Sequence, residues 1–394
     1  MITNSDKNIL ILTTVSGFLC KFEIENVKLL QQLGYIVHYA TNMKEQHYYF
    51  DENELKELGV QTHHIDIERS PYMLRANKRA LSRLIEIIQI HNIQTIHAHT
   101  PVGGLLSRLA VRRLKERKLK SIYTAHGFHF YKGAPLLNNT IYYYVEKKLA
   151  RHTDILIVIN DEDYQNAKKL RLRANGKVHK IEGAGLDLDK FQPLSEEQRD
   201  KQRNKLGLKK DDFFALSIGE LNANKNQEII LKTLAKKRQV ITNAKSFKYG
   251  ICGDGFLEEQ IESTVQQLKL EDMVILLGYQ KNVSAILGCA DCLIFPSKRE
   301  GLGMVGLEAL AMQIPVIASD NRGTREYMQH TKNGYVCEYN DIEGFAQGID
   351  YIMNLTKQQQ KEMKEHAKNC VKRFDKKIIA QKMKAIYLEL DKML

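Results

Sequence analysis

The stretch CLIFPSKREGLGMVGLEALAMQIPVI occupies residues 292–317. It predicts a buried strand, a turn with two glycines, the start of a helix, and a second strand after Pro315. Glu300 and Glu308 flank that turn, with seven residues between them. Because a helix N-terminus carries unpaired N–H groups and partial positive charge, the pattern predicts an anion site beside two carboxylates. A ligand that offers both phosphates and hydroxyls, such as a nucleotide-sugar, fits this site.

The rest of the chain predicts two α/β domains. Apolar runs of strand length alternate with amphipathic stretches, which is typical of a parallel sheet wrapped by helices. The turn-rich segment GAGLDLDKFQP at 183–193 interrupts this alternation, which then starts again. A highly charged stretch from 357 to 394 predicts one closing helix. We expect a first domain at 1–185, a second at 186–365, and a C-terminal helix at 366–394 that packs back towards the first domain.

The residues with useful chemistry follow predicted strands in both domains. Ligands of such folds bind beyond the carboxyl ends of the strands, so we expect a catalytic cleft between two doubly wound domains. The candidate segments are 16–17, 97–104, 126–132, 220–225, 253–255 and 300–308. The amides near Gly303, Met304 and Val305 would hold a diphosphate. Glu308 would bind a ribose, and Glu300 would face the group attached beyond the phosphates.

Composition narrows the choice of partners. The formal net charge is +12, and seven basic residues crowd into residues 108–120. This segment predicts either a solvated helix face or an electrostatic contact with an anionic membrane through residues 105–120. Nucleic acid is not expected, because no aromatic-basic interleaving accompanies the charge. No apolar run is long enough to span a membrane, which favours a cytoplasmic protein, with peripheral contact at the inner membrane face as the further expectation.

Several motifs together resemble the retaining glycosyltransferases of family four (glycosyl transferases group 1), which have the GT-B fold. Besides 292–317, the resemblance rests on SIGELNANKNQEIIL at 217–231, YGICGDGFLEEQI at 249–261 and PVIASDNRGTREYMQHTKNGYV at 315–336. In the first half, IHAHTPVGG at 96–104 and YTAHGFHFYKG at 123–133 are similar to enzymes that build bacterial surface polysaccharides. The resemblance therefore covers nearly the whole chain and implies two Rossmann-like domains.

The resemblance assigns roles to individual residues. It implies catalytic roles for His126 and Glu300, with Glu300 on the donor sugar. Lys225 would neutralise the donor phosphates, but Glu220 follows Gly219 where relatives often carry an arginine. The expected donor-binding residues are Gly17, Lys225, Gly253, Gly301, Gly303, Met304, Val305 and Glu308. The expected acceptor-binding residues are His99, His129 and Lys132.

The implied activity is transfer of a sugar from a nucleotide-diphosphate sugar, UDP-linked by resemblance, to a lipid-linked or saccharide acceptor in capsule, exopolysaccharide or O-antigen synthesis. Two alternatives remain open: a UDP-sugar 2-epimerase of the same fold, and a non-catalytic partner that binds nucleotide-sugars. No cofactor and no metal ion are expected, since the resemblance implies a metal-independent transferase. The sugar, the acceptor and the linkage do not follow from the sequence.

Overall fold

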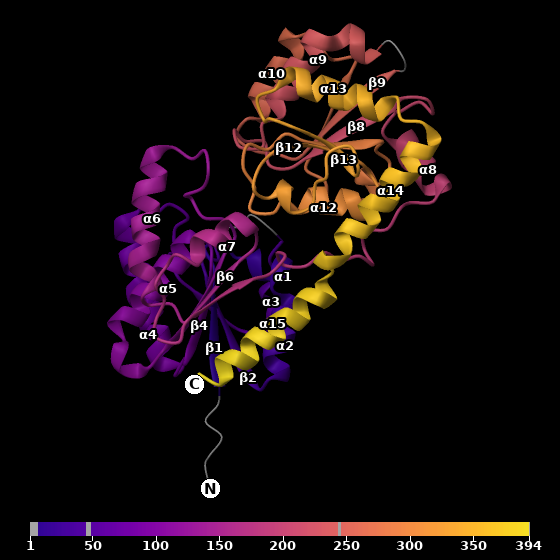
Figure 1. Cartoon of the computed structure of the whole chain (residues 1–394). Helices are drawn as coiled ribbons and strands as arrows, with labels where there is room; N and C mark the ends of the chain where they lie inside the picture. The colour runs from indigo at the N-terminus through magenta and orange to yellow at the C-terminus, as the bar shows by residue number, and fades with distance from the viewer. Residues whose placement is uncertain (1–6, 45–48, 243–245, 394) are drawn as a thin grey trace. The chain divides into compact units, whose positions relative to one another are not determined.

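The computed structural model describes residues 7–44, 49–242 and 246–393. The chain divides into two compact units, the first formed by Met1–Gly185 with Lys377–Leu394 and the second by Leu186–Lys376. Each unit is built around a parallel sheet with helices on it (Figure 1). This confirms the predicted α/β class with two doubly wound units.

In the first unit, the described residues form a sheet in the order β3-β2-β1-β4-β5-β6-β7. The strands are β1 (Lys7–Leu12), β2 (Tyr35–Thr41), β3 (Gln61–His64), β4 (Thr95–His99), β5 (Lys120–Ala125), β6 (Ile155–Val158) and β7 (Lys177–Lys180). All of the pairings are parallel. The strand order reverses between β1 and β4, so the loops that follow these strands occupy the position where such sheets bind ligands.

Helices cover this sheet because their apolar residues recur on one face. The helices are α1 (Phe18–Phe22), α2 (Ile24–Gln32), α3 (Glu52–Glu57), α4 (Leu74–Ile90), α5 (Pro101–Arg113), α6 (Leu136–Ala150) and α7 (Asp161–Ala167), with a 3₁₀ helix η1 (Lys115–Arg117). In α4 the buried residues Ala80, Leu84 and Ile87 follow helical spacing. They join one core cluster with Leu10 and Ile96 of the sheet.

In the second unit, the described strands lie in the order β10-β9-β8-β11-β12-β13. They are β8 (Phe213–Ile218), β9 (Phe247–Cys252), β10 (Val274–Gly278), β11 (Cys292–Phe295), β12 (Val316–Ser319) and β13 (Gly334–Cys337). The helices are α8 (Glu196–Lys205), α9 (Gln227–Thr242), α10 (Glu258–Gln267), α11 (Val283–Leu287), α12 (Met304–Ala311), α13 (Ile342–Met353) and α14 (Lys357–Val371), with a 3₁₀ helix η2 (Thr324–Glu326). The order reverses between β8 and β11, so the loops after these two strands are the expected ligand-binding loops.

The predicted single closing helix is wrong, because the chain forms α14, the 3₁₀ helix η3 (Lys372–Phe374) and α15 (Lys376–Asp391). Asp375 takes an extended conformation with ψ of 130°. The carbonyl of Phe374 accepts a hydrogen bond from the Leu186 amide at 2.7 Å, and the Lys376 amide donates to the Leu186 carbonyl at 3.0 Å. These bonds replace helical ones at the point where the chain leaves the second unit, and α15 then packs on the first.

The basic segment of residues 108–120 is not uniformly exposed. The Arg108 side chain is 1% exposed, and its guanidinium donates two hydrogen bonds to the Glu146 carboxylate, at 2.6 and 3.0 Å. Its guanidinium carbon also lies 4.3 Å from the centre of the Tyr123 ring. Arg108 therefore cannot contribute to a charged surface. Five other basic residues of the segment are exposed: Arg112, Arg113, Lys115, Arg117 and Lys118. No helix among the described residues is long and apolar enough to cross a membrane.

Replacing Arg108 by alanine should destabilise the first unit. The substitution leaves the Glu146 carboxylate without its partner in a mostly buried position, a change that costs about 3 to 5 kcal/mol. Arg112→Ala is the matched control, because Arg112 lies on the same helix and is exposed. It should change the free energy of unfolding by less than about 0.5 kcal/mol. Urea unfolding followed by circular dichroism compares the two, and equal effects would show that the buried pair is unimportant.

Candidate functional site

The N-terminus of α12 is shaped by Gly303. This residue precedes the helix with φ of +83°, and a Cβ atom at this position would lie 2.7 Å from a ring carbon of Phe295. Both facts require glycine, since other residues rarely adopt this conformation. As the N-cap residue, Gly303 has no side chain that could cap the helix. The amides of Met304 and Val305 in the first turn are therefore suited to bind an anion, as the sequence predicts.

Lys225 and Glu300 are paired at this end of the sheet. Lys225 lies in the loop between β8 and α9, and its Nζ atom lies 2.7 Å from the Glu300 carboxylate, which belongs to the loop after β11. The Lys225 ammonium also lies 5.2 Å from the centre of the Phe295 ring. The Asn222 side chain accepts a hydrogen bond from the Lys225 amide at 3.0 Å and so orders the loop. Two of the predicted donor-site residues are thus in direct contact.

Glu308 lies half-buried on α12 and shares a neighbour with Glu300. That neighbour is Tyr327, whose hydroxyl donates a hydrogen bond to the Gly303 carbonyl at 3.1 Å. Burial, together with the negative charges of Glu300 and Glu308, raises the pKa of Tyr327 well above its ordinary value. Tyr327 therefore stays protonated and supports the turn between the two carboxylates.

Close backbone packing explains another predicted glycine. Gly253 follows β9 with φ of +143°, and a Cβ atom there would lie 2.0 Å from the Gly219 carbonyl oxygen. Gly301 lies in the loop just before the N-terminus of α12. Glu220 is exposed beside this packed turn. A different cation approaches the site: Arg322 is 6% exposed, and its Nε donates to the Glu300 carbonyl at 3.4 Å.

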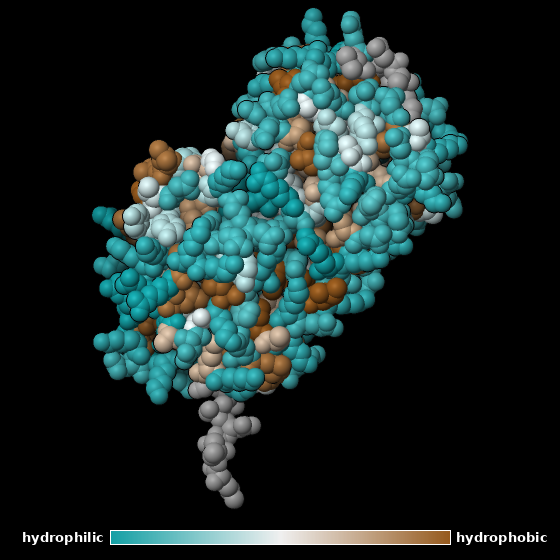
Figure 2. All heavy atoms as spheres, viewed as in Figure 1, coloured by the Kyte–Doolittle hydropathy of each residue, from teal (hydrophilic) through white to brown (hydrophobic). Residues whose placement is uncertain are grey.

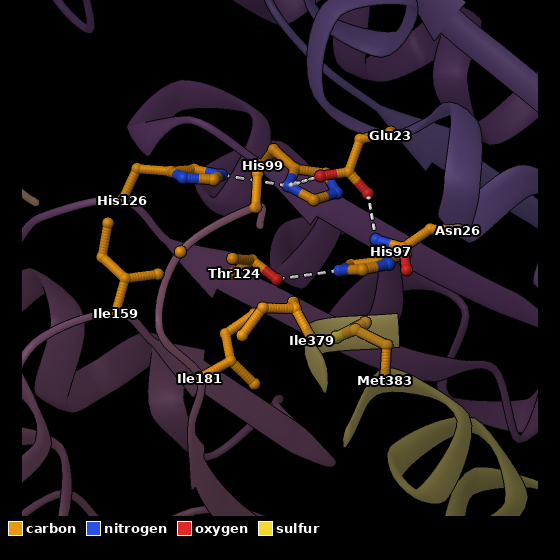
Figure 3. A pocket seen from close by; sticks show the side chains of 12 residues that line it. Glu23, Asn26, His97, His99, Thr124, His126, Ile159, Ile181, Ile379 and Met383 are labelled. Atoms are coloured by element: carbon orange, nitrogen blue, oxygen red, sulfur yellow. Dashed lines mark hydrogen bonds and ion pairs between the residues drawn. The ribbon is translucent and has the colours of Figure 1, made fainter. Parts of the chain in front are cut away.

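In the first unit, Glu23, His99 and His126 line a small pocket (Figure 3). His99 ends β4, His126 follows β5, and their Nδ1 and Nε2 atoms lie 3.1 Å apart. The same His99 nitrogen lies 3.6 Å from the Glu23 carboxyl group. The Asn26 side chain donates a hydrogen bond to the other oxygen of Glu23 at 2.7 Å. The side chains of Asn26, Glu23, His99 and His126 therefore form a chain of polar contacts.

Burial keeps these histidines neutral. It lowers the pKa of His126 to about 4 and that of His99 well below its ordinary value. His97 lies on the same face of β4 as His99, and burial lowers its pKa to about 3. Its two ring nitrogens contact the Tyr387 hydroxyl at 3.0 Å and the Thr124 hydroxyl at 2.8 Å. His97 is therefore a packed residue, whereas His126 remains partly exposed at the pocket.

Glu23 is a buried acid that the sequence analysis missed. Its side chain is almost completely buried, and this burial raises its pKa to about 7 although the hydrogen bond from Asn26 opposes the shift. Glu23 thus gains or loses its proton near neutral pH, next to the neutral His99 ring. In the sequence it looks like an ordinary acid between two short helices, so no local pattern marks it.

The other predicted residues of the first unit are more scattered. His129 is half-buried with its ring centre 4.9 Å from that of Tyr142. Lys132 is exposed, and its amide donates to the Glu162 carboxylate at 2.6 Å. Gly17 precedes α1 with φ of −76°, a conformation open to any residue. None of these three is among the described residues that line the pocket of Glu23, His99 and His126.

The two parallel-sheet α/β units have the GT-B architecture that is found in solved glycosyltransferase structures. The family model of the glycosyl transferases group 1 matches residues 198–370, and that of the glycosyl transferase 4-like domain matches residues 8–160. EpsD of Bacillus subtilis (strain 168), a protein assigned to the glycosyltransferases, is 35% identical over 97% of this chain and 96% of its own length. The chain belongs to the group 1 glycosyltransferase family.

A further relative and a solved structure extend the comparison. The Escherichia coli UDP-Gal:alpha-D-GlcNAc-diphosphoundecaprenol alpha-1,3-galactosyltransferase is 26% identical over 79% of each chain. The crystal structure of HepE from Anabaena in complex with UDP matches with a TM-score of 0.75 and 18% identity, over 97% of this chain and 99% of that one. HepE supports the GT-B fold. The family assignment confirms that the chain is a glycosyltransferase.

The pKa of Glu23 makes the stability of the first unit depend on pH. Unfolded Glu23 loses its proton near pH 4.5 and the folded residue near pH 7, so its contribution to stability is lost as pH rises between these values. The isosteric Glu23→Gln variant has no such titration. It should therefore match the wild type near pH 4 and exceed it at pH 8 by about 3 kcal/mol.

Urea unfolding of both chains at the two pH values measures this difference. The buried histidines have lowered pKa values and titrate in both chains, so their opposite effect on stability cancels in the comparison. A difference between the two chains that stays constant from pH 4 to pH 8 would contradict the raised pKa of Glu23.

Proposed function

We propose that this chain is a retaining glycosyltransferase that transfers a sugar from a UDP-sugar to a lipid-linked or saccharide acceptor during synthesis of a bacterial surface polysaccharide. The observation that carries the proposal is the contact of Lys225 with Glu300 beside the uncapped N-terminus of α12. This arrangement offers a cation and free amides for phosphates, and a carboxylate for sugar hydroxyls.

The donor diphosphate would bind to the Met304 and Val305 amides and to the Lys225 ammonium. Glu308, about one turn into α12, would accept hydrogen bonds from the ribose hydroxyls, and Glu300 would do so from the sugar. Gly301 would leave room for the nucleotide, and Gly253 would shape the neighbouring donor-binding turn through its close packing on Gly219. The same kind of ligand is named in the structures of HepE with UDP and with UDP-glucose, which supports a UDP-linked donor.

Glu220 occupies the position where relatives often carry an arginine, so a second cation near the donor would come from another part of the chain. Arg322 is buried and its guanidinium bonds to the backbone of Glu300, so its charge lies beside the loop that would hold the donor. We propose that Arg322 adds to the positive potential supplied by Lys225. Since the nucleoside diphosphate leaves with negative charge, preorganised cations and amides at this position would stabilise the transition state. The resemblance implies that this happens without a metal ion.

His126 would act at the reacting sugar as a neutral group. Its pKa of about 4 means that it offers a hydrogen bond rather than a charge near neutral pH. His99 contacts the Nε2 atom of His126, so this contact orients the ring and the direction of its other nitrogen. No protein nucleophile is assigned. His129 and Lys132 remain the proposed acceptor contacts.

An acceptor attached to a lipid would bring the chain to a membrane. The E. coli relative is named for an acceptor on diphosphoundecaprenol. Exposed apolar side chains gather on α6, at Leu136, Leu137, Ile141 and Tyr144, and Figure 2 shows brown residues over one end of this helix. We propose that this face and the exposed basic residues at 112–118 bind the anionic inner face of the cytoplasmic membrane. The proposed membrane surface thus contains only part of the segment 105–120 expected from the sequence, and it also includes α6.

The donor site is tested with the Glu300→Gln variant. It keeps the shape of the side chain but removes the carboxylate, so transfer should fall by roughly 100-fold or more while UDP binding stays within about threefold. A thermal-shift screen of nucleotide-sugars first identifies the donor. UDP release is then measured with a polyprenyl-diphosphate-linked saccharide as acceptor.

Glu259→Gln serves as the control, because Glu259 is an exposed acid on α10 in the same unit. It should leave UDP release unchanged. Near-normal turnover of Glu300→Gln would refute the assigned role. Conversion of the donor to its 2-epimer without an acceptor would identify the chain as an epimerase, and donor binding without transfer or hydrolysis would identify a non-catalytic partner.

The membrane proposal is tested by sedimentation with vesicles. Wild-type chain should bind vesicles that contain anionic phospholipid and bind neutral vesicles weakly. Two double variants should each weaken binding by roughly tenfold or more: Leu137→Glu with Ile141→Glu, and Arg112→Glu with Arg113→Glu. The first pair removes apolar side chains, and the second removes basic residues that contribute about 1 kcal/mol each near a membrane surface. Leu388→Glu is the control, as Leu388 is 42% exposed on α15. Unchanged binding of both double variants would exclude this surface.

A further inference from the structure

Three histidines meet at the edge of the first sheet, apart from the pocket of His99 and His126. His38 lies on β2, His63 on β3, and His91 directly after α4. Each offers one ring nitrogen, and the three nitrogens all lie within 4.8 Å of one another. The site described above uses β4, β5 and the loops after them, so this second cluster belongs to other elements of the unit.

The strand register explains why two of these side chains meet. In the parallel pair of β2 and β3, His63 lies opposite Ala40, which is two residues beyond His38. Side chains two residues apart along a strand point to the same face, so His38 and His63 are diagonal neighbours there. Ala40 lies on this face of the sheet and belongs to the same core cluster as buried residues of α4. His91, at the end of α4, reaches the pair from that helix.

Hydrogen bonds direct one lone pair towards the cluster. The amide oxygen of Asn8 lies 3.1 Å from Nε2 of His38, so this nitrogen carries the proton. Nδ1 of His38 then carries the lone pair of the ring, and this lone pair faces Nε2 of His63 at 3.0 Å. Metal-binding histidines are held in this way in proteins, with the second ring nitrogen bonded to an oxygen that fixes the tautomer.

The histidines are also in the protonation state that binds metals. Burial lowers the pKa of His38 and of His63 to about 4, so both rings are neutral at physiological pH. His38 is 1% exposed, whereas His63 and His91 are half-buried and open to an entering ion. Arg83 opposes a cation here through its charge near His63, but it forms an ion pair with Glu86 at 2.7 Å.

A hydrogen bond between His38 and His63 accounts for their contact without a metal. That hydrogen bond does not explain why a ring nitrogen of His91, at the end of α4, also lies close to the His38 and His63 nitrogens. The His91 ring centre lies 5.0 Å from that of His38 and 4.6 Å from that of His63. Because zinc lies about 2.0 Å from imidazole nitrogen, three tetrahedral ligand atoms are about 3.3 Å apart, and the partly exposed rings need only small rotations to reach this arrangement.

We propose that His38, His63 and His91 form a binding site for a divalent transition-metal ion, with zinc as the preferred occupant and water at the fourth position. Three neutral imidazoles suit zinc, nickel and copper, whereas magnesium and calcium prefer oxygen ligands. The bound ion would join the edge strand β3 to β2 and to the end of α4. It would therefore stabilise the first unit without taking part in sugar transfer.

Zinc titration of the full chain, prepared without a polyhistidine tag and treated with a chelator, tests the proposal. Calorimetry should show one zinc ion per chain, and saturating zinc should raise Tm by about 5 °C. Magnesium should give no shift. Cobalt(II) should develop visible absorption of a tetrahedral complex. Absence of a zinc-dependent rise in Tm would overturn the proposal.

Two variants locate the ion. His63→Gln and His91→Gln should each abolish the zinc-dependent rise in Tm, and His91→Gln changes a half-buried residue, so this variant should fold. His64→Gln is the matched control: His64 adjoins His63 but its Nε2 contacts Asp66 at 3.1 Å. It should retain the full rise. A zinc effect that survives in both cluster variants, or that disappears in His64→Gln alone, would place the ion elsewhere.

Discussion

Parallel strand pairing is the constraint on which the rest of this structure depends. When every strand of a sheet runs in one direction, all carboxyl ends reach the same edge, and each following loop starts there. Lys225 after β8 and Glu300 after β11 are far apart in sequence, yet adjacent strands bring them to 2.7 Å. The same rule places His99 at the end of β4 beside His126 after β5.

This constraint also explains what the sequence could predict. Strand positions follow from short apolar runs, so the ends of the strands and the residues beyond them could be identified without a structure. The segments that contain Glu300, Lys225 and Gly303 can be predicted in this way as candidates, whereas the role expected of Lys225 rests on the family resemblance. Gly303 illustrates why a local pattern can be predicted. Its positive φ and its close contact with the Phe295 ring both favour glycine at this position.

Residues that act through tertiary contacts could not be identified in this way. Glu23 becomes an unusual acid only because the fold buries it next to His99, and Arg322 approaches Glu300 only after two loops meet. The break between α14 and α15 depends on hydrogen bonds from Leu186, a residue far earlier in the chain. Charge and helix propensity alone predict one continuous helix there, because they contain no information about that partner.

The last helix has a consequence for how the chain is made. Tyr387 is completely buried in the first unit and contacts His97, next to the pocket that contains His126. Helix α15, which carries Tyr387 and belongs to the first unit, is thus translated after the whole second unit. During translation the second unit can fold before α15 is made, whereas the interior of the first unit stays partly uncovered until α15 emerges from the ribosome. The first unit, although most of it is synthesised first, is therefore the last to complete its folding.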